Sequence, residues 1–248
     1  MRYIYQFVGW ILRLSYEFIS NINPADSGPV SNYAFAIILM SVIIKLITLP
    51  LTLKQQESMA KTRALQTKVQ ELQEKYGNDM QTIARKQQEL YKEAGVSPLG
   101  GCLPLLIQMP ILFAMFAVVR QPDVYVFAEA GHYESINKAF FWMANIADKD
   151  KTMIIPILSG LVSFISQKII MASQPRPSTG NKEKDQAMKQ SNEMMTIMMP
   201  LMFVFIYRNL PAVIPLYMII NQGLQTIQQL IINKIFLKKV EGERDWVL

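Results

Sequence analysis

Cysteine and histidine are almost absent from this sequence. Cys102 is the only cysteine and His132 the only histidine among 248 residues. One cysteine excludes an intramolecular disulfide and a zinc site built from thiolates, and one histidine excludes a histidine metal cluster. The phosphate-binding Gly-x-x-x-x-Gly-Lys-Ser/Thr loop and the dinucleotide fingerprint are missing as well. We therefore expect a protein that is not an enzyme and that uses no cofactor and no metal.

Charged residues are also scarce within several long apolar stretches. Apolar residues make up 51% of the chain, and a helix needs about 20 of them in a row to cross a hydrocarbon core of about 30 Å. Such spans must be helical, because lipid cannot satisfy open backbone groups. The sequence predicts an all-α polytopic membrane protein with a five-span core in residues 31–237, its spans being 33–53, 99–119, 152–172, 194–208 and 212–236.

Residues 1–30 form a separate segment before the first span. Polar residues recur there at helical spacing on one side and apolar residues on the other, which predicts an amphipathic helix lying in the membrane interface. The alternative is a sixth span. The polar side holds Arg2, Gln6, Gly9, Arg13, Glu17 and Ser20, and the apolar side holds Ile4, Phe7, Ile11, Leu14 and Phe18.

The charges between spans predict the orientation. Lysine and arginine dominate 54–98, 168–192 and the short tail 238–248, whereas acidic residues outweigh them in 120–151. By the positive-inside bias, the first two segments and the C-terminus are cytoplasmic, in a bacterial plasma membrane. The net charge of +6 is then a topology signal, and we expect no direct reading of nucleic acid.

The first cytoplasmic segment, 55–94, predicts an antiparallel helical hairpin. Two amphipathic patterns flank a turn at Tyr76-Gly77-Asn78-Asp79, which is a typical turn sequence. The hairpin is either a mobile arm or a solvated connector without a partner. Residues 173–192 are rich in Pro, Ser and Lys, and we expect a disordered loop there.

Lys45 lies in the middle of the first span. A charge at that depth costs roughly 2.5–3.5 kcal/mol on insertion scales, so it is usually kept for pairing or function. One interpretation is a hydrated site within the membrane. The other is that the side chain snorkels toward the interface.

The other spans place polar residues in the same, cytoplasmic half of the membrane. Those that we select as lining a groove with Lys45 are Gln108, Ser163, Gln167, Asn221 and Gln225. A single amide is more often a contact between helices, but four spans contributing together favour a water-filled groove open to the cytoplasm. An apolar outer half argues against a channel, which needs polar lining from end to end.

The fourth span is rich in methionine. Met194, Met195, Met198, Met199 and Met202 crowd one short helix. Methionine-rich surfaces accommodate varied apolar partners. The span therefore either receives an apolar client helix or merely faces lipid and core.

Two motifs resemble the YidC/Oxa1/Alb3 family of membrane protein insertases. Residues 98–111, PLGGCLPLLIQMPI, look like the family signature at the start of the second core span, and residues 45–52, KLITLPLT, look like the end of the first. Residues 58–61, 91–92 and 167–168 match further family positions. The resemblance covers about residues 31–237 and implies the compact Gram-positive type of member.

The resemblance implies a groove in which a basic residue, here Lys45, draws the polar tail of a client into the bilayer. Apolar positions then form a slide toward lipid, and the matching residues are Pro104, Met109, Pro110, Met202 and Ile206. Nascent membrane proteins and membrane lipids are the implied partners, with the Sec translocon and the translating ribosome as further candidates. The family most often has arginine at position 45, and a desolvated lysine, unlike arginine, can lose its proton.

We therefore expect a membrane protein insertase and chaperone that acts without nucleotide hydrolysis. A small-solute transporter using the same cavity is the alternative, and a structural subunit of a larger complex is the third hypothesis. Transporters usually show paired repeats and broken helices, which are not evident here.

Overall fold

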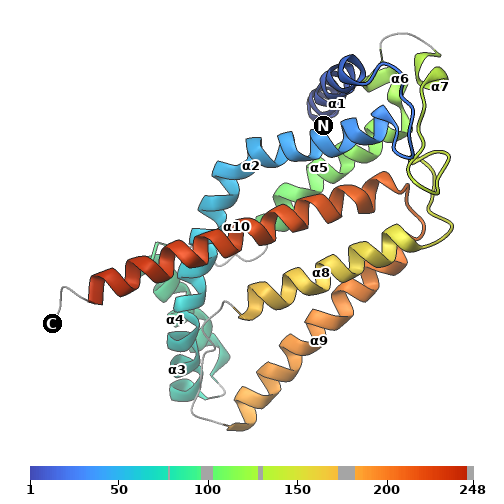
Figure 1. The fold of residues 1–248 in the computed structure, drawn as a ribbon. Helices are drawn as coiled ribbons and strands as arrows, with labels where there is room; N and C mark the ends of the chain where they lie inside the picture. The colour runs from blue at the N-terminus through green and yellow to red at the C-terminus, as the bar shows by residue number, and fades with distance from the viewer. Residues whose placement is uncertain (78, 96–102, 128–130, 173–181, 245–248) are drawn as a thin grey trace. The chain divides into compact units, whose positions relative to one another are not determined.

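The computed structural model describes residues 1–77, 79–95, 103–127, 131–172 and 182–244 (Figure 1). Within these residues all regular elements are helices, and extended pairing is limited to isolated β-bridges. The chain divides into two compact units. The first comprises Met1–Leu46, Leu112–Gln174 and Thr196–Leu248, and the second Ile47–Ile111 and Pro175–Met195.

Five long helices correspond to the predicted spans: α2 (Asn32–Ala64), α5 (Leu103–Arg120), α8 (Ile154–Ala172), α9 (Lys182–Tyr207) and α10 (Val213–Arg244). In the described part, two stretches are long and apolar enough to cross a bilayer, Asn32–Gln56 in α2 and Ile154–Met171 in α8. Shorter apolar stretches lie in α5, Leu106–Arg120, and in α9, Thr196–Tyr207. The number of five spans therefore stays a prediction.

Helix α2 starts where the sequence supplies a cap. The Ser31 hydroxyl accepts a hydrogen bond from the amide of Ala34 at 3.2 Å, which satisfies one of the amides that a helix start leaves open. The residues after Ser31 are apolar and turn one face inward. The side chains that are fully buried in the first unit include Leu12, Tyr33, Ile37, Met40, Met115, Ile146, Ile214 and Tyr217.

Helix α1 (Arg2–Ile22) packs against the short helix α6 (Pro122–Tyr125), which in turn contacts α7 (His132–Ser135). Val8, Gly9, Ile11, Leu12 and Ser15 are its buried residues. A Cβ atom at Gly9 would collide with the backbone carbonyl of Tyr125. The prediction that Gly9 belongs to an exposed polar stripe is therefore wrong, because this glycine permits a close approach of backbones.

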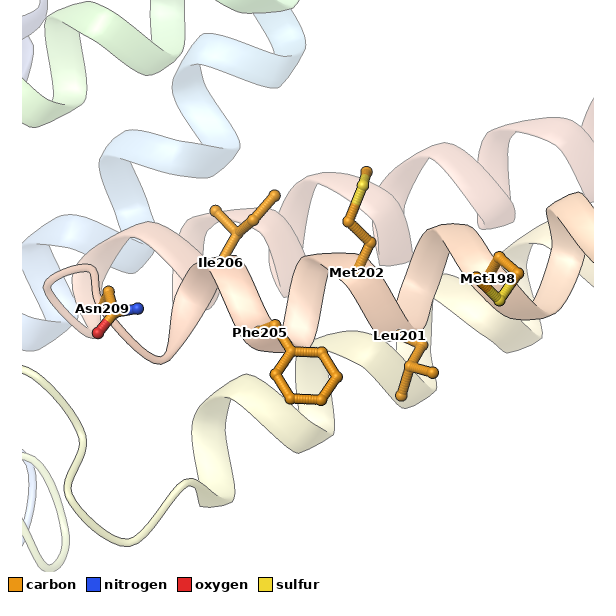
Figure 2. Close-up of a pocket in the computed structure, with 6 residues that line it drawn as sticks. All are labelled: Met198, Leu201, Met202, Phe205, Ile206 and Asn209. Atoms are coloured by element: carbon orange, nitrogen blue, oxygen red, sulfur yellow. The ribbon is translucent and has the colours of Figure 1, made fainter.

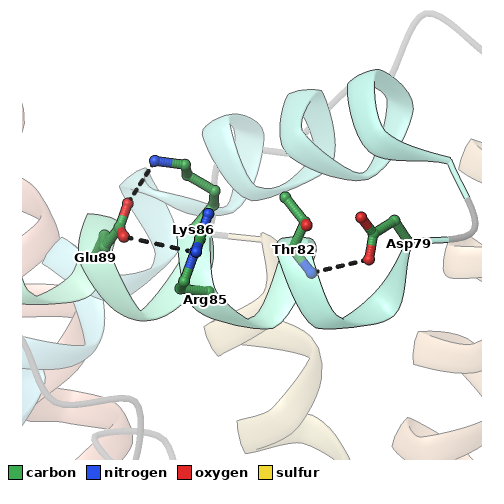
Figure 3. Close-up of polar contacts among 5 residues, drawn as sticks. All are labelled: Asp79, Thr82, Arg85, Lys86 and Glu89. Carbon is green, nitrogen blue, oxygen red and sulfur yellow. Dashed lines mark hydrogen bonds and ion pairs between the residues drawn. The ribbon is translucent and has the colours of Figure 1, made fainter.

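The second unit contains α3 (Gln66–Tyr76) and α4 (Met80–Glu93), which pack against each other. The Asp79 carboxylate accepts a hydrogen bond from the Thr82 amide at 3.1 Å (Figure 3). Hydrogen bonding to Thr82 lowers the pKa of Asp79. One turn further along, Lys86 lies 2.7 Å from Glu89 and Arg85 lies 3.9 Å from it. These are exposed contacts that support an isolated helix.

Two helix boundaries differ from the predicted ones. The expected disordered loop 173–192 is wrong for 182–192, because α9 begins at Lys182; residues 173–181 lie outside the described residues. The segment from Lys182 contains Lys, Glu, Gln, Ala and Met and no proline or glycine, and these are strong helix formers. Helix α10 continues to Arg244 and includes most of the expected tail 238–248, whose last four residues lie outside the described part.

Candidate functional site

Lys45 lies on the inward face of α2. The buried residues of this helix recur every three or four positions: Ile37, Met40, Ser41, Ile44 and Lys45. The Lys45 residue is only 6% exposed. Ser41, one turn before it, donates its hydroxyl to the Ile37 carbonyl at 2.7 Å. The helix thus directs its one intramembrane cation toward protein, in the direction that a client site requires and that a lipid-facing snorkelling lysine would not take.

A hydrogen-bonded seam joins α8 to α10, the two long helices that pack together most extensively. Ser163 donates to the side-chain oxygen of Gln222 at 2.6 Å. Three residues on, the Thr226 and Ser166 hydroxyls lie 2.8 Å apart. Both serines are buried. This seam holds two helices together without a charge, as polar side chains commonly do between spans.

The predicted groove residues of α10 lie one position before the seam residues. Asn221 and Gln225 precede Gln222 and Thr226 and are half-buried. Because neighbouring helix positions are about 100° apart, the pair 221 and 225 occupies the face next to the seam. The structure therefore brings Ser163 onto Gln222 rather than onto Asn221. Gln108 is half-buried on the part of α5 that belongs to the second unit.

Helices α8 and α9 lie side by side (Figure 1) and make close contacts. A Cβ atom at Gly160 would collide with a methyl group of Val204. The Gln167 amide donates to the Met199 sulfur at 3.6 Å, and the Thr196 hydroxyl lies 2.8 Å from the Met171 sulfur. Gln167, a predicted groove residue, is therefore positioned by a methionine of the neighbouring helix.

The opposite side of α9 is apolar and open. Figure 2 shows a shallow depression along this helix, lined by Met198, Leu201, Met202, Phe205, Ile206 and Asn209. Met202 and Ile206, two of the predicted slide residues, are 50% and 43% exposed. Met199 turns toward α8, so the methionine-rich stretch divides between a contact with α8 and an exposed surface. This division follows the helical period.

The other predicted slide residues are on α5. Met109 and Pro110 are half-buried in the second unit. Pro104 falls in the first turn of α5, but its side chain lies outside the described part of the structure.

Sequence reasoning selected Ser163 and Asn221 but missed that Gln222 and Thr226 are the partners of α8. A signal was present. Positions 222 and 226 are four apart and positions 163 and 166 are three apart, and both spacings place two polar groups on one helix face. What was missing was the knowledge that these two faces meet. The sequence analysis also overlooked Thr196 and its contact with Met171.

A family model described as the 60Kd inner membrane protein matches residues 26–239. A membrane protein insertase YidC from Fusobacterium nucleatum is 35% identical over 227 residues, covering 92% of this chain and 98% of that protein. This chain belongs to the YidC/Oxa1 family. The resemblance of the sequence motifs is thereby confirmed.

Other YidC/Oxa1 family members extend well beyond the shared region. The YidC of Haemophilus influenzae is 37% identical over 213 residues, which are 86% of this chain but 35% of that protein. A crystal structure described as an active YidC insertase with its first transmembrane domain resolved has a TM-score of 0.58. It is 25% identical and matches 92% of this chain and 45% of that one. The helical fold is therefore that of the family core.

Proposed function

We propose that this chain is a membrane protein insertase and chaperone of the bacterial plasma membrane that acts without nucleotide hydrolysis. Relatives across most of its length bear the name of membrane protein insertase. The observation that carries the mechanism is Lys45, a buried cation on the inward face of an apolar helix. Such a charge is costly unless it serves function.

In the proposed topology, α2, α5, α8, α9 and α10 are the five core spans, and the C-terminus is cytoplasmic. The basic segments 54–98 and 168–192 support this orientation. Helix α1 lies in the interface, and its exposed Phe7, Trp10 and Phe18 suit headgroup depth. Helices α3 and α4 then stand in the cytoplasm, where they recruit nascent clients. The Sec translocon and the translating ribosome are further proposed partners.

The groove provides a polar path through the inner leaflet. Lys45 attracts acidic residues in the client's short translocated tail. Asn221, Gln225, Gln108 and Gln167 supply hydrogen bonds to the client backbone. We assign Ser163 a supporting role, because its hydroxyl is used by Gln222. A client segment then crosses about half of the apolar barrier, which lowers the cost of transferring its unpaired polar groups.

The apolar surface of α9 carries the client out of the groove. Met202 and Ile206 present flexible and branched side chains that suit many helix sequences. We propose that Met109, Pro110 and Pro104 extend this slide. Burial of the client's apolar surface in lipid supplies the driving force, on the order of 25 cal/mol per Å² removed from water.

The test is insertion into liposomes by the purified full chain. Two single-span clients are compared that differ only in having acidic or neutral translocated tails. Lys45→Ala and Lys45→Met should each reduce insertion of the acidic client by about tenfold, as a weakening of about 1.4 kcal/mol would produce. Lys45→Arg should restore it, and the neutral client should change much less.

Equal losses for the two clients would contradict the electrostatic role of Lys45. No insertion by the unaltered chain, measured beside an established insertase, would contradict the proposed function itself. Access of water is measured separately with Lys45→Cys on a Cys102→Ser background. An aqueous maleimide should label this cysteine in intact liposomes, and complete protection would contradict a hydrated groove.

A further inference from the structure

Two large aromatic side chains are exposed side by side in the segment between α7 and α8. Phe141 is 59% exposed and Trp142 is 44% exposed. Their rings are stacked, with centroids 6.0 Å apart and planes at 25°. Aromatic side chains bury large apolar areas when they have a partner. This pair leaves much of its surface open.

The backbone around the pair is firmly held. The Phe141 amide donates to the Pro29 carbonyl at 2.5 Å, and the Ser31 amide donates to the Ala139 carbonyl at 2.9 Å. Phe140 and Met143 exchange two further backbone hydrogen bonds of 2.8 Å each. The exposure of the two rings is therefore a fixed feature of a hydrogen-bonded turn.

Phe141 adopts a left-handed backbone conformation, with φ at +47°. This conformation costs a residue with a side chain roughly 1–2 kcal/mol and is usually taken by glycine or asparagine. A bulky aromatic residue there is strained, and strain of this kind clusters at functional positions. Here the strain turns the Phe141 ring outward beside Trp142.

The pair is tied to the starts of two membrane-spanning helices. Pro29 and Ser31 immediately precede α2. The Trp142 indole N–H donates to the Asp150 carboxylate at 3.1 Å, and the same carboxylate accepts the amide of Ile155 in the first turn of α8 at 2.8 Å. The two rings therefore lie near the level at which both helices enter the bilayer.

We propose that Phe141 and Trp142 form a wedge that inserts into the lipid headgroup region beside the starts of α2 and α8. This inference rests on the proposed membrane topology, which makes this the outer leaflet. The Trp142 N–H, its only donor, is already used by Asp150, so the exposed remainder of the ring is apolar. Aromatic side chains with this character gather at membrane interfaces.

Lipid suits this surface better than a protein partner does. The first turns of α8 are themselves exposed and apolar, at Ile154, Ile157, Leu158 and Leu161. In the proposed topology those residues face lipid tails. The wedge continues that apolar surface toward the headgroups, where a ring is buried about 5–10 Å deep at the acyl boundary.

Fluorescence quenching in liposomes tests the wedge in the full chain. The chain has three tryptophans, so Trp10→Phe with Trp246→Phe leaves Trp142 as the only reporter. Phosphatidylcholine brominated near the headgroup should quench it about twice as strongly as lipid brominated deep in the tails. Aqueous iodide should quench it little.

Quenching by iodide alone would place the ring in water and overturn the proposal. Absence of quenching by either agent would mean a protein cover and would overturn it too. As the control, Glu134→Trp in a background without the other tryptophans should respond to iodide, since Glu134 is exposed on α7.

Phe141→Asn provides a second test, because asparagine tolerates the left-handed conformation. The variant should keep its thermal stability in detergent while quenching of Trp142 by shallow bromines falls at least twofold. Unchanged quenching would remove Phe141 from the wedge. The assay contains no client, so it can fail while the Lys45 insertion assay succeeds, and the two proposals are tested separately.

Discussion

Asp150 joins the segment after α7 to the start of α8, and its replacement tests the stability of this region. The buried carboxylate accepts four hydrogen bonds. Oδ1 accepts from the Thr152 hydroxyl at 2.6 Å, from the Thr152 amide at 3.0 Å and from the Trp142 indole at 3.1 Å. Oδ2 accepts from the Ile155 amide at 2.8 Å. Burial disfavours the charge, but these hydrogen bonds outweigh it, and the pKa of Asp150 is lowered.

Asp150→Asn preserves the shape and one oxygen. With that oxygen at the Oδ1 position, three hydrogen bonds persist in neutral form, and an NH2 group meets the Ile155 N–H. Losing one hydrogen bond to a charged group and leaving a buried donor unsatisfied costs roughly 1.5–3 kcal/mol. We expect a lower free energy of unfolding by that amount at pH 7. Asp150→Ala removes all four contacts and should cost about 3–5 kcal/mol.

The dependence on pH supplies the decisive comparison. A carboxyl whose pKa is lower in the folded state contributes stability that is fully present above the unfolded pKa of about 3.9. That contribution is lost as the pH falls through the folded value. Thermal unfolding in detergent, followed by circular dichroism, should show the wild type and Asp150→Asn converging as the pH drops below about 4. A constant difference from pH 7 to pH 3 would refute the reasoning.

Two further predictions concern the contacts of α8. In a double-mutant cycle, Ser166→Ala and Thr226→Val should show a coupling of about 0.6 kcal/mol, the average for polar contacts between spans; a coupling of zero in unfolding measurements would mean that the seam hydrogen bond is not formed. Gly160→Ala should destabilise the protein by roughly 1–3 kcal/mol through overpacking against Val204, and Val204→Ala in the same chain should recover most of that loss of melting temperature; additive losses would contradict the contact.

The sequence predicted the helical elements well, because each depends on local patterns. The run of apolar residues after Ser31 gave α2, and the turn at residues 76–79 is the point where α3 ends and α4 begins. The predicted all-helical class agrees with the described residues. Lys45 was conspicuous because a charge in an apolar run is costly wherever its partners lie.

Helix faces that meet in space were harder to predict. The polar face of α10 is broad in sequence, and only packing against α8 reveals that Gln222 and Thr226 form the contact while Asn221 and Gln225 do not lie in the seam. Gly9 looked polar for lack of a side chain, whereas its role is the close approach to Tyr125. The start of α9 at Lys182 was missed because dense charge was given more weight than helix propensity.

The contact between Gly9 and Tyr125 has a consequence for shortened versions of the chain. Since no side chain fits between these backbones, α1 has a single rotational setting, and its rings cover the neighbouring ones. Tyr5 meets Tyr125 edge to face at 5.8 Å, and Tyr16 meets Phe127 at 5.4 Å. Deleting the first 22 residues would uncover aromatic surface on the core and invite aggregation, so this helix belongs in any minimal functional unit.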